Sequence, residues 1–332
     1  LSSDRNHPLV NHAISGQYPP GSTFKIVAAC GALEEHVVDR HTRLTCKGTL
    51  LLPSKLYPDD PTKAQEFHCW LERGHGPLNV VEAIQHSCDI FFYQVAGGYK
   101  SFRGLGMDRL AEYAEMLGFG QRTGIELSGE APGLVPSDRW KRQNYGEQWV
   151  TGDTYNAAIG QGYVLVTPLQ LLNATAAVAN GGTLYRPQLF YEITDADGKM
   201  VRRLVPEPIR ELQVSAENLA LVRLGMRRAV TQGTAWLANL PGVAVAGKTG
   251  TAEYPGVDEE GNLLLDDKGH LPTHSWFTAF APFQDPEIAL VVFLEGGGEG
   301  SQTAVPVAAK ILRYYFDLPE ARSARAAAPP SG

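Results

Sequence analysis

A serine and a lysine three residues apart, Ser22 and Lys25, have the types and spacing for nucleophilic chemistry. They follow Pro19-Pro20-Gly21 and open the apolar stretch 26–33. Proline and glycine interrupt the preceding chain, so the pattern predicts a buried helix with Ser22 in its first turn. Because positions i and i+3 share a helix face, Lys25 would lie beside Ser22, where poor solvation lowers the pKa of an amine and lets it accept the hydroxyl proton.

The same helix start offers unpaired backbone N–H groups and a partial positive charge. Both stabilise the oxyanion that develops when Ser22 attacks a carbonyl. The pair by itself has a second interpretation, an ordinary capping serine followed by a surface lysine. The spacing alone does not decide between the two.

A second group, Lys248-Thr249-Gly250-Thr251, follows the apolar residues 243–247. The pattern is typical of a strand, and an edge strand can bind an extended peptide by backbone pairing. Lys248 would supply positive charge for a carboxylate, and the hydroxyls of Thr249 and Thr251 could hydrogen-bond it. Taken alone, the segment also fits a strand that ends in a Thr-Gly turn.

A third group, Ser87-Cys88-Asp89, separates a helical stretch, 80–86, from an aromatic run, 90–93. Ser87 and Asp89 on one turn can point into one cleft and move a proton to or from Lys25. The order serine–lysine, serine–acid, lysine–threonine–glycine indicates acyl transfer through a serine. The sequence has no G-x-S-x-G, H-E-x-x-H or G-x-x-x-x-G-K-[ST] motif, and Gly160-Gln161-Gly162 lacks the third glycine of a dinucleotide site.

Three of the four cysteines lie close together in the sequence with a histidine among them: Cys46, Cys69, His75 and Cys88. Three thiols and one imidazole suffice for a tetrahedral structural zinc site, although paired C-x-x-C knuckles are missing. The alternative is a Cys46–Cys69 disulfide with Cys88 simply buried. The fourth cysteine, Cys30, lies on the apolar helix and is expected to pack in the core.

Composition excludes several classes of protein. The chain has 332 residues, 43% hydrophobic and 20% charged, which is typical of a globular protein. Its net charge of −7 and its lack of a basic cluster argue against nucleic-acid binding. The longest strongly apolar run, 288–294, is far shorter than the roughly 20 residues that cross a bilayer. The polar start without methionine leads us to expect a fragment whose upstream part is missing.

Periodicity and capping signals predict the elements that position these groups. Helices are expected at 24–35, 80–96, 108–117, 168–179 and 215–230, and strands at 243–246, 276–281 and 288–294. Strands at one end with helices between favour an α+β or α/β layer plus a helical lobe. The residues from 319 to 332 lack any periodic pattern and are expected to form a disordered tail.

These residues resemble the transpeptidase domain of class B high-molecular-mass penicillin-binding proteins, and within it the elongation-type (penicillin-binding protein 2-like) members. The resemblance covers almost all of residues 6–317. Besides the three motifs it includes 16–21, 158–162, 167–170, and 276–277 before 280–282.

The resemblance implies an α/β (α+β) fold of the penicillin-binding protein/serine β-lactamase type. A five-stranded antiparallel sheet, with strands from both chain ends, would carry flanking helices and a helical subdomain. The domain would span 1–318, with a sheet lobe from about 1–45 and 225–318 and a helical lobe from about 46–224. An N-terminal anchor and pedestal would precede this chain.

The resemblance also implies the role of each motif residue. Ser22 would be the acyl-accepting nucleophile and Lys25 its general base, with Ser87 moving the proton. The Lys248-Thr249-Gly250-Thr251 strand would hold the terminal carboxylate of a D-Ala-D-Ala stem peptide, and the backbone N–H groups of Ser22 and Thr251 would form the oxyanion hole. Many relatives have asparagine at the position of Asp89, so the sequence leaves open whether Asp89 tunes the charge on Lys25 or only caps a turn.

The implied activity is D,D-transpeptidation of peptidoglycan in side-wall elongation, with β-lactams as covalent inhibitors. The implied setting is the outer face of the bacterial cytoplasmic membrane, with a SEDS-type glycosyltransferase as partner. Some elongation-type relatives carry Zn²⁺ near the active site, with carboxylates where Cys46 and Cys69 stand here. The motif residues are also compatible with two other functions: a serine β-lactamase, and a β-lactam sensor or scaffold without turnover.

Overall fold

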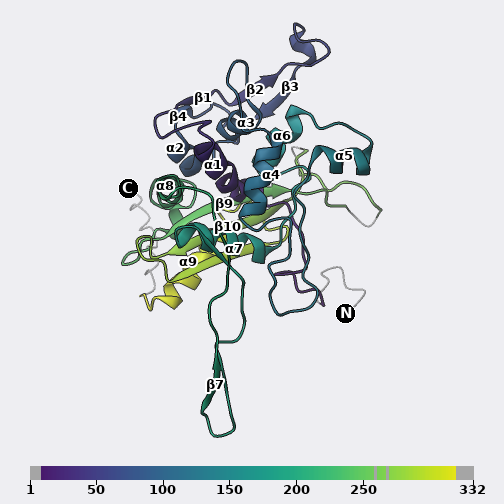
Figure 1. Cartoon of the computed structure of the whole chain (residues 1–332). Coiled ribbons are helices and arrows are strands. Elements are labelled where there is room, and N and C mark those ends of the chain that lie inside the picture. The colour runs from purple at the N-terminus through teal and green to yellow at the C-terminus, as the bar shows by residue number, and fades with distance from the viewer. Residues whose placement is uncertain (1–8, 258–259, 267–268, 319–332) are drawn as a thin grey trace, which may run out of the picture.

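The computed structural model describes residues 9–257, 260–266 and 269–318. The expected tail, 319–332, lies outside them. A central antiparallel sheet has the strand order β11-β10-β9, formed by β9 (Ala246–Glu253), β10 (Thr273–Ala281) and β11 (Ile288–Leu294) (Figure 1). β10 is buried along almost its whole length, as expected for a strand covered on both faces.

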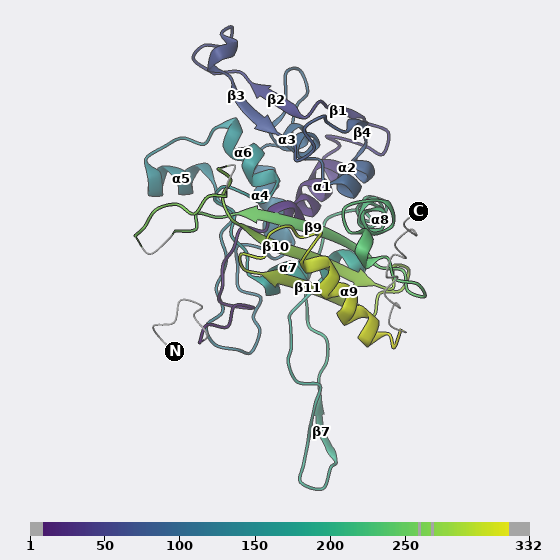
Figure 2. The ribbon, with the colours of Figure 1, turned by 180° about the vertical axis from the view of Figure 1, so that it is seen from behind.

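Two helices cover opposite faces of this sheet. α7 (Pro168–Ala179) packs against β10 and β11 on one face, and α9 (Ala304–Tyr315) packs against the same strands on the other (Figures 1 and 2). α7 begins at Pro168, as the sequence predicts, and the structure adds Thr167 as its N-cap. It belongs to the stretch 46–224 that was assigned above to the helical lobe, yet it contacts the sheet.

The other helices surround α1 (Lys25–Glu34), whose residues are all buried except Glu34. They are α2 (Val80–His86), α3 (Asp89–Gly97), α4 (Met107–Met116), α5 (Asp138–Tyr145), α6 (Thr151–Ala158) and α8 (Ala216–Gln232). α1 contacts five of them, because its surface is apolar nearly all round: α2, α3, α4, α6 and α8. α8 also packs against β9, which links the helices to the sheet.

Four two-stranded ribbons complete the described fold. β1 (Leu44–Cys46) pairs with β4 (Gly76–Leu78), and β2 (Thr49–Leu52) pairs with β3 (Gln65–His68). β5 (Thr183–Tyr185) pairs with β8 (Pro208–Glu211), and β6 (Glu192–Thr194) pairs with β7 (Met200–Arg203) in a hairpin that projects away from the body (Figure 1). Short 3₁₀ turns lie at Gly21–Phe24, Pro61–Lys63 and Trp236–Ala238.

The structure differs from the predicted elements chiefly in three places, and it contains α5, α6, α9 and the four ribbons, for which no prediction was made. The described part of the sheet has three strands rather than five, and the described N-terminal residues 9–20 form only an isolated bridge, Tyr18↔Val166. The helix expected at 80–96 is broken at Ser87 and Cys88 into α2 and α3, at the turn that was expected for Ser87 and Asp89. The strand expected at 243–246 begins only at Ala246. The carbonyls of the two residues before it bind groups outside the sheet: Ala244 O accepts from Phe283 N, and Val245 O accepts from the Arg227 guanidinium.

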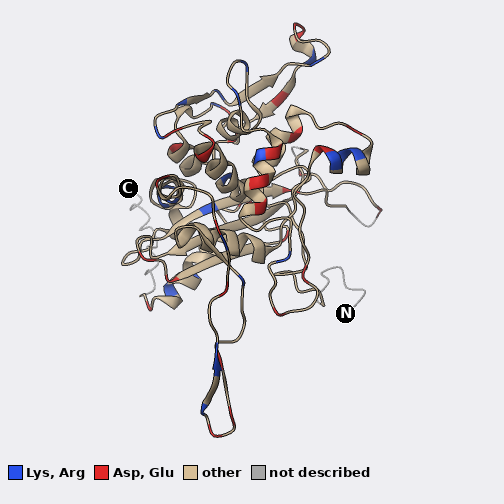
Figure 3. Ribbon diagram, in the orientation of Figure 1, with Lys and Arg blue, Asp and Glu red and all other residues tan. Residues whose placement is uncertain are grey.

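The distribution of charged and apolar residues along the chain agrees with the composition of the sequence. Lys and Arg residues are interspersed with Asp and Glu in the view of Figure 3. Among the residues described, no helix is both long and apolar enough to span a membrane.

Candidate active site

The predicted nucleophile lies on a tight turn at the start of α1. Gly21–Phe24 form a 3₁₀ turn and the α-helix begins at Lys25, which is fully buried. Ser22 is partly exposed, and no side-chain hydrogen bond caps either helical segment. The alternative of a capping serine and a surface lysine is therefore wrong.

The break between α2 and α3 presents Ser87 to Lys25. Ser87 has φ 54° and ψ 43°, a left-handed conformation that is uncommon for a residue with a side chain. This turn aims both its carbonyl and its hydroxyl at Lys25, whose Nζ lies 2.8 Å from Ser87 O and 3.1 Å from Ser87 Oγ. Such strain persists when the surrounding structure holds it, and it is common at functional sites.

Asp89 provides the counter-charge for Lys25. Its Oδ1 lies 2.6 Å from Lys25 Nζ, and both groups are almost completely buried. Its other oxygen, Oδ2, accepts a hydrogen bond from the backbone N–H of Trp70 at 3.1 Å. The structure therefore answers the question that the sequence left open, because Asp89 contacts Lys25 directly.

Lys248 approaches the same hydroxyl from the sheet. Its Nζ lies 2.8 Å from Ser87 Oγ and 2.9 Å from the carbonyl oxygen of Thr249. Burial, and then the positive charge of Lys25, lower the pKa of Lys248 well below its ordinary value. Ser87 Oγ thus lies between two amines, one paired with a carboxylate and one that is easily neutral.

The two threonines of β9 contact residues that the sequence did not single out. Thr249 Oγ1 lies 2.8 Å from Thr234 Oγ1, and Thr251 Oγ1 donates a hydrogen bond to Glu299 Oε2 at 2.9 Å. Thr234 follows α8 and Glu299 follows β11, so no local sequence signal connects either one with β9. Within the described structure, the backbone N–H of Lys25 donates to Ser22 O, but no hydrogen bond joins Ser22 Oγ to Lys25 Nζ; such side-chain contacts often form only when substrate binds.

The loop at Gly160 packs directly on the nucleophile turn. Gly21 N donates to Gly160 O at 2.9 Å, and a Cβ on Gly160 would lie 2.2 Å from Gly21 O. Gly160 also has φ +71°, which disfavours a side chain. Any residue other than glycine would push the loop away from Ser22.

We expect Gly160→Ala to slow acylation of Ser22 by about tenfold or more, because displacement of the turn misplaces the nucleophile. Gly146→Ala is the matched control, since Gly146 also has φ +71° but open space around it. The measurement is the second-order rate of adduct formation with a β-lactam. Equal rates in the two variants would mean that the contact with Gly21 does not position Ser22.

The four predicted metal ligands meet at one point. Their ligand atoms, three Sγ and one imidazole nitrogen, all lie within 4.8 Å of one another: Cys46, Cys69, His75 and Cys88. His75 Nδ1 is 3.7 Å from Cys46 Sγ and 3.5 Å from Cys69 Sγ. These distances match the edges, roughly 3.5–3.8 Å, of a tetrahedron built on ordinary zinc–ligand bond lengths.

The cysteines in this cluster form no disulfide, and Cys30 is a free, fully buried thiol in the core. Contacts with Cys69 and Cys88 lower the pKa of the Cys46 thiol, which favours a thiolate. The His75 nitrogen that faces the sulfurs is Nδ1, and Nε2 is buried without a hydrogen-bond partner in the described structure. The residues therefore fit a tetrahedral metal ion.

The metal cluster and the catalytic candidates share two short segments. Cys88 lies between Ser87 and Asp89, and Cys69 precedes Trp70, whose N–H binds Asp89. Trp70 Nε1 also donates to the carbonyl of His86, the last residue of α2. An ion bound here would therefore fix the two segments that position Asp89: Cys88, its neighbour in the chain, and Cys69-Trp70, which binds its carboxylate.

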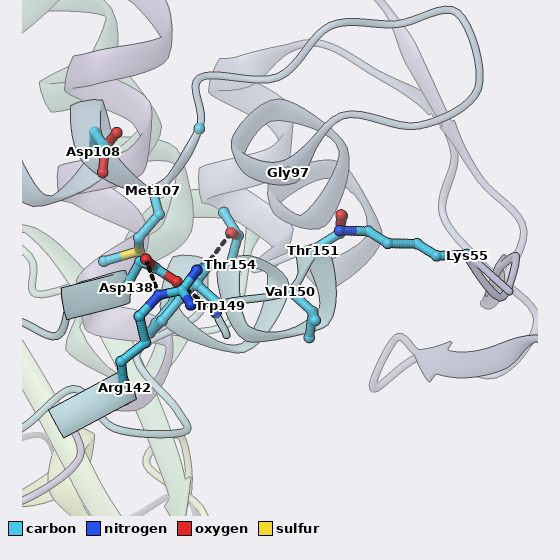
Figure 4. A pocket seen from close by; sticks show the side chains of 11 residues that line it. Lys55, Gly97, Met107, Asp108, Asp138, Arg142, Trp149, Val150, Thr151 and Thr154 are labelled. Atoms are coloured by element: carbon cyan, nitrogen blue, oxygen red, sulfur yellow. Dashed lines mark hydrogen bonds and ion pairs between the residues drawn. The ribbon is translucent and has the colours of Figure 1, made fainter. Parts of the chain in front are cut away.

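A cavity of about 410 Å³ lies away from these residues, between α4, α5 and α6 (Figure 4). Asp138 and Arg142 on its wall pair with each other at 2.7 Å, and Trp149 Nε1 donates to Thr154 Oγ1. None of the catalytic candidates lines it. Two pairs of its polar side chains bind each other, and it lies apart from the catalytic candidates, so we do not include it in the site.

The geometry defines a serine acyl-transfer site of the Ser-x-x-Lys class: a nucleophile on a helix start, a buried lysine beside a second serine, and a lysine from a strand. Comparison with known proteins agrees. The family model of the penicillin binding protein transpeptidase domain matches residues 2–313. The chain belongs to this family.

Relatives of known name are similar over nearly the whole chain. Peptidoglycan D,D-transpeptidase MrdA of Haemophilus influenzae is 35% identical over 324 residues, which are 96% of this chain and 47% of that protein. MrdA of Escherichia coli K12 is 34% identical over 322 residues, 96% of this chain and 48% of that protein. The chain thus spans about half the length of the curated relatives it matches.

Solved structures give the same result. Pseudomonas aeruginosa PBP2 in complex with WCK 5153 has a TM-score of 0.79 and 33% identity, and the match covers 96% of this chain and 66% of that one. Helicobacter pylori PBP2 in complex with MreC has a TM-score of 0.77 and 27% identity, covering 96% and 53%. The mixed α/β fold of the transpeptidase domain is therefore established for this chain.

Proposed function

We propose that this chain is the catalytic domain of a peptidoglycan D,D-transpeptidase. The observation that carries the proposal is the Ser87 hydroxyl, which lies 3.1 Å from Lys25 Nζ and 2.8 Å from Lys248 Nζ behind the Ser22 turn. Two buried amines that share one hydroxyl can exchange a proton without water. That exchange is what a serine nucleophile needs at neutral pH.

In the proposed reaction, a bond forms between Ser22 Oγ and the carbonyl carbon of the penultimate D-Ala, and the bond to the terminal D-Ala nitrogen breaks. Lys248 takes a proton from Lys25 through Ser87, which leaves Lys25 neutral to accept the proton of Ser22. A proton returns along the same path to the departing nitrogen. The nitrogen of an amine from a neighbouring stem peptide then forms an amide bond with the ester carbonyl carbon, the bond from that carbon to Ser22 Oγ breaks, and the proton lost by the amine returns to Ser22 Oγ.

Similarity to the relatives supports a proposal for the substrate and the setting. The chain is similar to proteins named peptidoglycan D,D-transpeptidase, to Helicobacter pylori PBP2 solved with MreC, and to a chain of a solved peptidoglycan synthase complex. We therefore propose side-wall elongation as the process, D-Ala-D-Ala stem peptides as donors and β-lactams as inhibitors. The partner would be a SEDS-type glycosyltransferase at the outer face of the cytoplasmic membrane, and the sheet would gain the two further strands of the five-stranded family fold.

Intact mass after brief incubation with benzylpenicillin tests the proposal. A single adduct that persists after free drug is removed supports a transpeptidase site. Rapid loss of the adduct with drug hydrolysis would indicate a serine β-lactamase instead. No adduct at all would indicate a scaffold without chemistry.

We also propose that Cys46, Cys69, His75 and Cys88 hold a structural Zn²⁺. The support is the set of four ligand atoms within 4.8 Å and the two His75 distances that suit a tetrahedron. When bound, zinc would supply a rigid cross-link and no reactive group. The chain itself orients Asp89 by the Trp70 N–H and leaves Lys25 in place beside Ser87.

Zinc removal is expected to lower the free energy of unfolding by about 3 kcal/mol or more, because structural zinc is bound mainly by the folded chain. The measurements are zinc content by elemental analysis and thermal unfolding before and after chelation. Cys46→Ser should lose zinc, whereas Cys30→Ala, which removes a core thiol outside the cluster, should keep it. Absence of zinc after metal-replete, reducing purification would refute the site.

A further inference from the structure

The hydroxyl of Thr251 is already engaged by a carboxylate of the same chain. Thr251 Oγ1 donates to Glu299 Oε2 at 2.9 Å and accepts a hydrogen bond from Gly300 N at 3.3 Å. A hydroxyl carries one proton to donate. The proton of Thr251 is therefore held by Glu299 and is not offered to a ligand.

The backbone of Glu299 is fixed, so this contact does not depend on a loose loop. Glu299 O accepts hydrogen bonds from Gln302 N and Thr303 N, at 3.0 and 3.1 Å. Gly300 packs so closely on β9 that a Cβ there would lie 2.4 Å from Gly250 O. The side chain of Glu299, in contrast, is exposed and can rotate away from Thr251.

The position of this carboxylate conflicts with the ligand expected there. The inference rests on the proposed function, in which the hydroxyls of Thr249 and Thr251 receive the terminal carboxylate of the donor peptide or of a β-lactam. A ligand carboxylate would meet Glu299 at hydrogen-bond distance from the same hydroxyl. Like charges at that separation repel, and the repulsion is moderate because the side chain is exposed to water.

We propose that Glu299 determines specificity by occupying the Thr251 subsite as an internal carboxylate. An anionic ligand must displace it, whereas a ligand without a carboxylate at this position need not. Glu299 thereby selects against anionic ligands and leaves neutral ones unaffected. Nothing in the local sequence of either segment indicates the contact, because 48 residues separate the two side chains.

The test compares two probes, benzylpenicillin and its methyl ester, on the intact chain. Glu299→Gln keeps a side-chain oxygen that can accept from Thr251 but removes the charge. We expect its second-order acylation rate with benzylpenicillin to rise about fivefold, as for one unit charge removed at about 4 Å in water. With the methyl ester the rate should change less than about twofold.

Glu295→Gln is the matched control. Glu295, like Glu299, follows β11 and is exposed, and its carboxylate is 3.9 Å from His12 Nδ1 and not on Thr251. Both probes should acylate this variant at the wild-type rate. An increase equal to that of Glu299→Gln would show a general effect of charge and overturn the assignment to the Thr251 subsite.

The remaining outcomes separate the two proposals. If the wild-type chain forms no adduct with benzylpenicillin, the proposed function itself fails. If the wild type is acylated but Glu299→Gln is unchanged or slower with benzylpenicillin, the role of Glu299 is refuted and the proposed function stands. An equal gain with the methyl ester also refutes it, because the ester has no carboxylate to be repelled.

Discussion

Ser22→Ala is expected to abolish the covalent adduct with benzylpenicillin completely, since alanine has no atom that can form the ester. The fold should remain intact. Ser22 is only partly buried and its side chain caps neither helical segment, so its removal should change the free energy of unfolding by about 0.5 kcal/mol or less. Intact mass and thermal unfolding of the same preparation measure the two quantities together.

Ser101→Ala provides the control for this variant, because Ser101 is exposed and contributes to none of the three motifs. It should be labelled at the wild-type rate. A persistent adduct on Ser22→Ala, located on another residue by peptide mapping, would show that the nucleophile is misassigned.

Lys25→Ala is expected to slow acylation by about 10²–10⁴-fold, the contribution of a positioned general base. It should also destabilise the fold by about 3–5 kcal/mol, because Asp89 would remain as a buried carboxylate without its partner at 2.6 Å. The change should move the pH dependence as well. Lys25 helps to lower the pKa of Lys248, so its removal should raise that pKa and shift the residual rate profile toward higher pH.

A double variant, Lys25→Met with Asp89→Asn, separates stability from chemistry. It removes both charges, so the free energy of unfolding should return toward the wild-type value, while acylation should stay slow. Stopped-flow acylation and chemical denaturation measure the two effects. Acylation that recovers together with stability would mean that Lys25 acts only by holding the fold.

Much of the site could be predicted from the sequence because its signals are local. Pro19-Pro20-Gly21 stops the chain before an apolar helix, and that pattern correctly predicted a buried Lys25 three residues after Ser22. The helix at 168–179 begins at a proline after a threonine cap and was predicted with its correct bounds. Each of these features depends on residues within one or two turns of one another.

Where the sequence was ambiguous, the missing information was the packing of distant segments. The break between α2 and α3 falls where Ser87 adopts a left-handed turn held against Lys25, 62 residues away. β9 begins later than expected because Arg227 and Phe283 bind the carbonyls just before it. Neither contact can be predicted from the local periodicity of hydrophobic residues, because each joins segments that are far apart in the sequence.

The sequence by itself determined the class of chemistry, because the three motifs contain the reacting groups and their order identifies the family. Only the tertiary structure decided how those groups are paired. It pairs Asp89 with Lys25, places the Ser87 hydroxyl between the amines of two lysines, and hydrogen-bonds Glu299 to Thr251. The physical reason is that charge pairs and shared hydroxyls act over about 3 Å, and only the packing of helices against the sheet brings side chains far apart in the chain that close.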